Sequence, residues 1–224
     1  GAGSYGDRGA DPGACLGSRK PREPEPGDRN RAGAQDRQGP LPLMVGSKGS
    51  TISQQGMEAW LWEAANILRG SAVDRTDWKG YILPLLFFKR LSDVWDEDYR
   101  EAFEDSRDEG YATATANDRF TIPEGAHWKH ARHASRDVGR ALMHAYKAIE
   151  AANPQRLQGV FGNAAWTDKA QMPDETLKNL IEHFSKHTLS LVNVPEDELG
   201  NGYEYLIKQF ADDSGHTAQE FYTN

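Results

Sequence analysis

The chain has 224 residues, enough for one or two ordinary domains, and its formal net charge is −8. Its single cysteine, Cys15, excludes an intrachain disulfide and a cysteine-held zinc site, a usage that suits a reducing cytoplasm. The longest apolar run, residues 81–88, contains Pro84 and is much shorter than the roughly 20 residues of a membrane-spanning helix. We therefore expect a soluble cytoplasmic protein.

Composition divides the chain near residue 50. Residues 1–50 hold 11 of the 22 glycines, 6 of the 11 prolines and one of the 22 aromatic residues. They lack the apolar side chains that offset the entropy of ordering a chain, so we expect a disordered tail or a non-native leader. Residues 51–224 carry 18 basic and 28 acidic residues, a net charge of −10. An acidic domain of this kind is a poor DNA binder by itself, because DNA affinity depends on Lys and Arg at the phosphates.

Helical periodicity dominates from residue 55 onward, and no segment alternates with a period of two. The fold class we predict is all-α: an irregular helical bundle of about five main helices. Their apolar stripes are Leu61, Ala64, Ala65 and Leu68; Phe88, Leu91, Trp95, Tyr99 and Phe103; Val138, Leu142, Ala145 and Ile149; Leu177, Leu180, Ile181 and Phe184; and Tyr203, Leu206, Ile207 and Phe210.

The same pattern suggests a domain organisation. Residues 51–200 are predicted to form a helical N-terminal domain, within which residues 106–127 make a long connection. Residues 201–224 are predicted to form a junction helix and a loop that lead into a further domain, one that this sequence does not contain.

The chain shows no motif of catalysis, and we expect no catalytic residue and no metal site in it. Residues 96–98, Asp-Glu-Asp, are most simply a solvated helix face. Histidines recur at residues 127, 130 and 133 and again at 183 and 187, spacings that could chelate a metal on a helix. Without cysteines or well-placed carboxylates nearby, solvent-facing or capping histidine is the favoured interpretation.

Two segments carry a resemblance to a known family. Trp62-Glu-Ala-Ala-Asn-Ile-Leu-Arg-Gly and Tyr81-Ile-Leu-Pro-Leu-Leu-Phe-Phe-Lys-Arg-Leu-Ser-Asp resemble the helical N-terminal domain of the modification subunit of type I restriction–modification systems. That subunit is an adenine-N6 DNA methyltransferase that depends on S-adenosylmethionine. Leu199-Gly-Asn-Gly-Tyr-Glu-Tyr-Leu-Ile-Lys-Gln-Phe-Ala and the ending Ala218-Gln-Glu-Phe-Tyr-Thr are similar to the junction into its methyltransferase domain.

The resemblance implies cofactor-binding residues at the end of the chain: Glu220, Phe221, Tyr222 and Thr223. In the family this loop helps to hold the methionine end of S-adenosylmethionine. Asn224 stands where the family usually has proline. The glycine-rich cofactor loop and the Asn-Pro-Pro-aromatic catalytic motif would lie beyond residue 224, so we expect the parent protein to bind the cofactor and this fragment not to. The alternative is that the aromatic pair anchors a loop on the bundle.

The resemblance also implies partners: the specificity subunit, a second modification subunit, the restriction subunit, and double-stranded DNA in the assembled complex. The candidate phosphate contacts are Lys89, Arg90, Arg132, Arg136 and Arg140, with ordinary surface charge as the alternative. A stand-alone helical adaptor or nucleic-acid-binding module without enzymatic activity is the competing hypothesis. A metal-dependent enzyme that uses the histidines is the weakest one.

Overall fold

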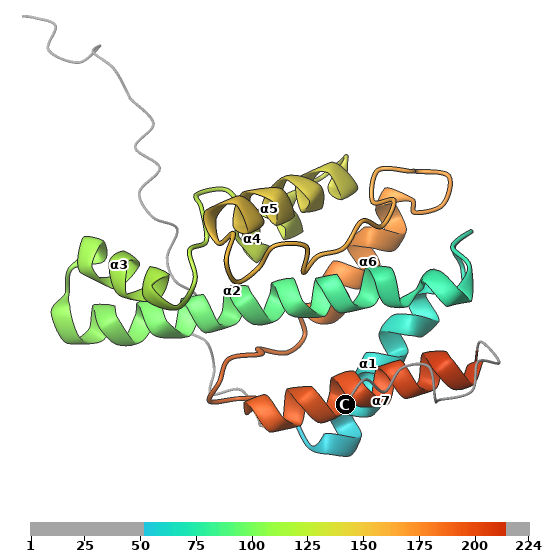
Figure 1. Cartoon of the computed structure of the whole chain (residues 1–224), viewed down its shortest axis with the longest axis horizontal. Coiled ribbons are helices and arrows are strands. Elements are labelled where there is room, and N and C mark those ends of the chain that lie inside the picture. Colours follow the sequence, from blue (N-terminus) through green and yellow to red (C-terminus); the bar gives the residue numbers. More distant parts are fainter. Residues whose placement is uncertain (1–51, 214–224) are drawn as a thin grey trace, which may run out of the picture. The chain divides into compact units, whose positions relative to one another are not determined.

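The computed structural model of the chain describes residues 52–213, and their regular elements are helices (Figure 1). In chain order these are α1 (Gln54–Leu68), the short 3-10 helix η1 (Arg75–Asp77), α2 (Lys79–Ser106), α3 (Glu109–Arg119), α4 (Trp128–His133), α5 (Val138–Ala152), α6 (Asp174–Phe184) and α7 (Glu196–Asp213). Residues 52–213 contain no strand, so the all-α prediction is confirmed. The five predicted stripes fall on α1, α2, α5, α6 and α7.

The predicted tail and the end of the predicted junction lie outside the described residues. The predicted boundary at residue 200 is not tested, although α7 already begins at Glu196. Within residues 52–213, no helix combines the length and the apolar character that crossing a membrane requires.

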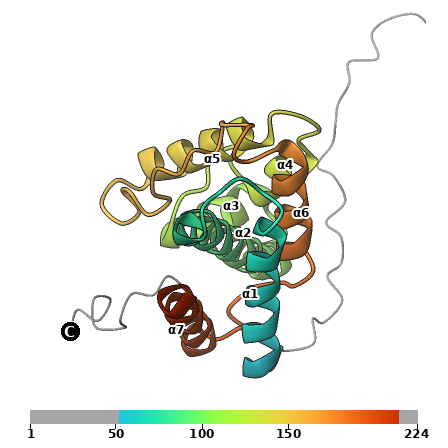
Figure 2. The ribbon, with the colours of Figure 1, turned by 90° about the vertical axis from the view of Figure 1, so that its right-hand side faces the viewer.

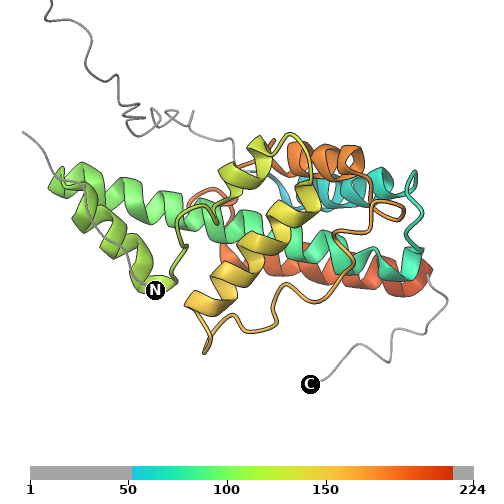
Figure 3. The ribbon, with the colours of Figure 1, turned by 90° about the horizontal axis from the view of Figure 1, so that it is seen from above.

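α2 is the helix around which the others pack. It has 28 residues and contacts η1, α3, α4, α6 and α7. In the view along its axis, α4 and α5 lie on one side of α2, α1 and α6 on a second side, and α7 below it (Figure 2). Seen from above, α3 folds back beside the C-terminal half of α2 (Figure 3). A single long helix therefore packs against elements from both ends of the described chain.

An aromatic cluster fills the space between α2 and α5. Phe88 of α2 has no exposed surface, and its ring centroid lies 5.4 Å from that of Trp128, 5.3 Å from that of Tyr146 and 6.3 Å from that of Phe161. The rings of Tyr146 and Phe161 stack at 4.3 Å with an interplanar angle of 5°. Pairs in such geometries stabilise a core beyond the effect of apolar burial alone. The cluster fixes α4, α5 and the connection after α5 against α2.

The prediction of a connection over residues 106–127 is wrong for its first half, where α3 forms. Asp108 begins this helix by accepting a hydrogen bond from the Tyr111 N–H at 2.8 Å. Only two of its side chains are buried, Ala112 and Ala116, which lie one turn apart and are fully buried. Two alanines give no recognisable apolar stripe, but they allow α3 to approach α2 closely. Tertiary packing rather than local propensity determines this helix.

Two glycines allow backbones to approach closely. Gly139 lies in the first turn of α5, where a Cβ atom would lie 1.8 Å from the carbonyl oxygen of Trp166. Gly202 of α7 faces α1, and a Cβ atom there would lie 2.9 Å from the side chain of Leu61. The first contact is with backbone, which cannot rotate away, whereas the second is with a flexible side chain. Gly139 is therefore the more constrained position.

We predict that Gly139→Ala destabilises the fold by about 3 kcal/mol, because the Trp166 backbone must shift to admit the methyl group. Gly200→Ala is the matched control, since Gly200 lies in α7 and a Cβ atom there would meet nothing within 4 Å beyond its chain neighbours and its own helix backbone. That change should raise the free energy of unfolding by up to about 1 kcal/mol through helix propensity. Urea denaturation measures both; similar values for the two variants would contradict the packing described here.

Candidate functional site

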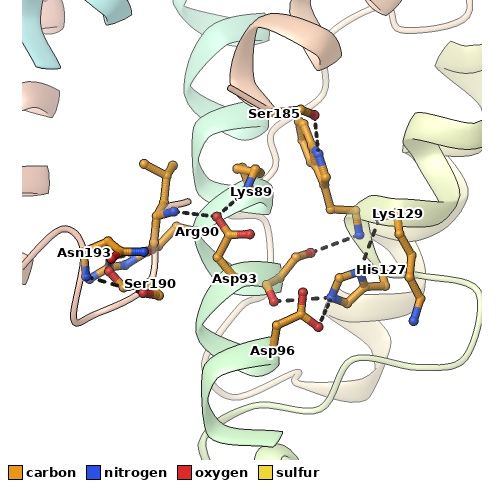
Figure 4. A network of polar contacts seen from close by, with 12 residues as sticks. Lys89, Arg90, Asp93, Asp96, His127, Lys129, Ser185, Ser190 and Asn193 are labelled. Carbon is orange, nitrogen blue, oxygen red and sulfur yellow. Dashed lines mark hydrogen bonds and ion pairs between the residues drawn. The ribbon is translucent and has the colours of Figure 1, made fainter. Parts of the chain in front are cut away.

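Three charged side chains on one face of α2 hold the connection between α6 and α7. Arg90, Asp93 and Glu97 have the i, i+3, i+7 spacing that places side chains along one side of a helix. Together with the backbone of residues 189–194, which they bind, we call them the α2 clamp. Figure 4 shows Arg90 and Asp93 reaching from α2 to that connection.

Arg90 binds carbonyl oxygens of the connection. Its Nη1 atom lies 2.5 Å from the oxygen of Leu189, 2.8 Å from that of Ser190 and 2.7 Å from that of Val194. These carbonyls lie in a turn outside any helix, so helix hydrogen bonding cannot satisfy them. All three contacts are made by Nη1, so its two N–H bonds are shared among the three carbonyl oxygens.

The two carboxylates of the clamp bind N–H groups of the same connection. Asp93 Oδ2 accepts a hydrogen bond from the Leu189 N–H at 2.6 Å. Glu97 accepts two, from Leu191 at 2.8 Å and from Val192 at 3.2 Å. Donors and acceptors of the turn are thus matched by charges of opposite sign on α2, and such charge-assisted bonds are stronger than neutral ones.

The clamp is buried. Arg90, Asp93 and Glu97 are 7%, 8% and 3% exposed, and Lys89, at 5%, donates to Asp93 Oδ2. Burial raises the pKa of Asp93, and burial lowers the pKa of Arg90. Buried charges of this kind are stable when they are paired and costly when one partner is removed. The clamp therefore fixes where α7 starts.

A second feature is an exposed basic surface at the junction of α4 and α5. We call it the basic corner and define it by Lys129, Arg132, Arg136 and Arg140, all of which are exposed. Residues 128–147 carry five Lys or Arg against one Asp, a net charge of +4. This contrasts with the net charge of −10 over residues 51–224. Positive charge is therefore concentrated on one part of an acidic domain.

Some of this charge is neutralised locally. Arg132 Nε and Nη2 each donate to a different oxygen of Glu182, both at 2.8 Å, in a bidentate pair that links α4 to α6. Arg136 and Arg140 form no ion pair within residues 52–213. These two guanidinium groups are the members of the basic corner best placed to bind an external anion.

The third feature is an apolar groove of about 890 Å³ between α2, α7 and the connection after α5. Its walls include Leu83 and Phe87 from α2, Val160 from the connection and Leu199 and Tyr203 from α7. Val160 is 39% exposed and Tyr203 49% exposed, although both are large apolar side chains. Apolar concavities of this size are typical of ligand or partner sites.

The histidines have structural partners. His183 donates from Nε2 to the Trp60 carbonyl at 2.8 Å, and Trp60 Nε1 donates back to the His183 carbonyl at 3.3 Å. His127 begins α4 by accepting from the Lys129 N–H at 3.3 Å, and its Nε2 lies 3.1 Å from Asp96 Oδ1. Among residues 52–213, no three histidine, cysteine or acidic side chains come together in a way that could hold a metal ion.

The structure separates the five predicted nucleic-acid contacts into two groups. Lys89 and Arg90 lie buried beside the α6–α7 connection and have internal partners, whereas Arg132, Arg136 and Arg140 lie exposed on the basic corner. Contact with nucleic acid is tested for none of the five and stays a prediction. The predicted cofactor-binding residues, Glu220, Phe221, Tyr222 and Thr223, lie outside the described residues.

Sequence reasoning missed the clamp. The prediction of a solvated face at residues 96–98 is wrong for Glu97, which is 3% exposed and binds the α6–α7 connection. One feature of the sequence could have indicated that these charged side chains are buried. Arg90, Asp93 and Glu97 share a helical face with apolar residues. Tyr203 was assigned to the same stripe as Leu206, but it lines the groove instead.

The fold and these surfaces define a single type of structure, an all-helical domain. Residues 57–184 match the protein family described as "HsdM N-terminal domain". The match spans more than half of the chain, so the chain belongs to the HsdM N-terminal domain family, the helical domain of type I restriction–modification methyltransferase subunits.

A solved structure has the same fold. It is the crystal structure of the type I restriction-modification system methyltransferase subunit from Streptococcus thermophilus, which is 25% identical in sequence and superposes with a TM-score of 0.58. The similarity covers 73% of this chain and 40% of that subunit, so the chain spans less than half of its relative's length. No curated protein sequence matches the chain.

We predict that Glu97→Gln lowers the free energy of unfolding by about 1.5–3 kcal/mol, because the neutral amide weakens two charge-assisted bonds to the Leu191 and Val192 N–H groups. The matched control is Glu101→Gln, one turn further along α2, where the side chain is exposed. Chemical denaturation followed by far-UV circular dichroism measures both. Equal stability of the two variants would show that the clamp does not hold the connection.

Proposed function

We propose that this chain serves as the N-terminal helical domain of an adenine-N6 DNA methyltransferase subunit and contributes to subunit assembly and DNA engagement. The observation that carries the proposal is the family match over residues 57–184. The similarity to a methyltransferase subunit of a type I system supports it. Methyl transfer from S-adenosylmethionine belongs, in this proposal, to the whole subunit rather than to the helical domain.

The cofactor enters the proposal only through residues 220–223. Glu220, Phe221, Tyr222 and Thr223 are proposed to face the methionine end of S-adenosylmethionine in a complete subunit. Catalysis on a flipped adenine also requires a positioned acceptor for the amino group beside the methyl donor. We assign that acceptor to no residue of this chain.

The proposed partners are the specificity subunit, a second modification subunit, the restriction subunit and double-stranded DNA, in the cytoplasm. Recognition of the DNA sequence is proposed to belong to the specificity subunit. The helical domain would supply contacts to the phosphate backbone, which position a protein on DNA without reading the sequence. Its overall negative charge fits a domain that engages DNA only within a larger assembly.

The basic corner supports the part of the proposal that concerns DNA. It concentrates a net charge of +4 over residues 128–147, in contrast to the acidic remainder of the domain. Arg136 and Arg140 are the best candidates, because each is exposed and neither is paired with a carboxylate within residues 52–213. Arg132 would have to exchange Glu182 for a phosphate, which makes its contribution smaller.

We predict that the double change Arg136→Ala and Arg140→Ala weakens DNA binding by the assembled methyltransferase about equally on all sequences. Two lost phosphate contacts should reduce the slope of log K against log salt by roughly 2. Fluorescence anisotropy at several salt concentrations measures both quantities.

The matched control for this experiment is the double change Arg100→Ala and Lys208→Ala, which removes two exposed positive charges from α2 and α7, away from the basic corner. This variant should keep the salt slope of the unmodified complex. If both double variants show the same slope, the basic corner does not contact DNA.

We also predict that the 224-residue chain alone shows no measurable affinity for S-adenosylmethionine by isothermal titration calorimetry. The reason is that residues 220–223 supply only one side of the pocket proposed for the whole subunit. A micromolar dissociation constant for the isolated chain would overturn this division of labour between the helical domain and the remainder of the subunit.

A further inference from the structure

Large apolar side chains around the groove remain exposed. Val160, from the connection after α5, is 39% exposed, and Tyr203, from α7, is 49% exposed. Leu83 and Phe87 line the α2 side and are only partly buried. Removing such side chains from water is favourable, so a groove of about 890 Å³ that they line favours a partner with an apolar surface.

The three cations that line the groove have partners inside the chain. Arg90 binds the carbonyl oxygens of the α6–α7 connection. Arg119 Nε lies 3.3 Å from Asp98 Oδ2. Lys79 also has an interaction within the chain. The positive charge of the lining is therefore already engaged before any partner binds.

The carboxylates that line the groove are not engaged in this way. Asp77 lies in η1 and Glu196 at the start of α7, and because α7 runs antiparallel to α2 the two mark opposite ends of the groove (Figures 1 and 3). Both are exposed, and neither forms an ion pair within residues 52–213. The helix α7 as a whole carries six acidic residues and one lysine, a net charge of −5. The free charge beside the groove is therefore negative.

We propose that the apolar groove binds an amphipathic helix of a different protein subunit, with apolar side chains against α2 and Lys or Arg side chains against α7. This inference rests on the part of the proposed function that concerns subunit assembly, and it adds the chemistry of the partner. Apolar anchors at positions i, i+3, i+4 and i+7 of a helix suit a hydrophobic groove. A basic flank complements the free carboxylates and disfavours partners with an acidic flank.

The two helical walls of the groove favour a helix over an extended segment. The backbone groups of α2 and α7 are paired within their own helices, so these walls offer an extended chain no ladder of N–H and C=O partners. A helix satisfies its own backbone groups. The part of α2 that lines the groove, from Lys79 to Val94, rises about 22 Å, which equals about four turns of a docked helix.

Photo-crosslinking in the assembled methyltransferase tests the identity of the occupant. A benzophenone amino acid replaces Val160 on the groove wall; in the matched control it replaces Tyr111, which lies on α3 outside the groove and is 58% exposed. The probe at position 160 should crosslink at least about tenfold more of another subunit, because the yield follows the effective concentration of the target. Mass spectrometry should locate the crosslink in a segment with apolar residues at helical spacing and a net positive charge.

The other outcomes of this experiment overturn the inference. They are equal crosslinking at the two positions, a crosslink to another part of the same subunit, a crosslink to a second copy of the chain, and a crosslink to a segment without basic residues. In each case the subunits still assemble, so the proposed function survives. Failure of the unmodified subunits to assemble, measured by mass photometry, contradicts the proposed function and the inference with it.

Neutral variants test the contribution of charge. The double change Asp77→Asn and Glu196→Gln should weaken binding of the crosslinked subunit about fivefold at low salt and less than about twofold at 0.5 M salt, because salt screens exposed charges. The matched control, Glu101→Gln and Glu104→Gln, removes two exposed carboxylates from α2 outside the groove and should leave the affinity unchanged. Biolayer interferometry measures both. Equal affinities of the two double variants at low salt would overturn the inference.

Discussion

The arrangement of this domain depends on the contact between α2 and the connection that precedes α7. That connection is a turn whose N–H and C=O groups lie outside any helix or strand, and three of its residues, Leu189, Ser190 and Val194, are buried. Arg90, Asp93 and Glu97 satisfy them from a single helical face. Because these ions are buried, removing one of them would leave a buried charge without its partner, which is strongly destabilising. The complete set holds the start of α7 in one place.

The position of α7 in turn shapes the surface. α7 packs against α1 through Gly202, which allows close approach, and its outer side turns Leu199 and Tyr203 toward α2. The space left between α7, α2 and the connection after α5 is the apolar groove. The basic corner lies on other elements, α4 and the start of α5, so an apolar contact and an anion contact can be made independently.

The sequence alone predicted the helices with strong apolar periodicity, such as α5 and α6, because each buries a continuous apolar stripe. The sequence alone did not predict the contacts in which the buried residues are small or charged. α3 is held by Ala112 and Ala116, which carry no periodic signal, and Glu97 looks like surface charge until the α6–α7 turn is placed against it. Likewise, the exposure that distinguishes Arg136 and Arg140 from Lys89 and Arg90 arises from tertiary packing.

The most direct test of the central role of the clamp is amide hydrogen exchange at Leu191 and Val192, resolved by NMR. Both residues lie outside the helices, and Val192 is 75% exposed, so local structure alone predicts fast exchange. Their hydrogen bonds to the Glu97 carboxylate predict protection that approaches that of helix α2. Exchange at the rate of an unprotected loop would contradict the account.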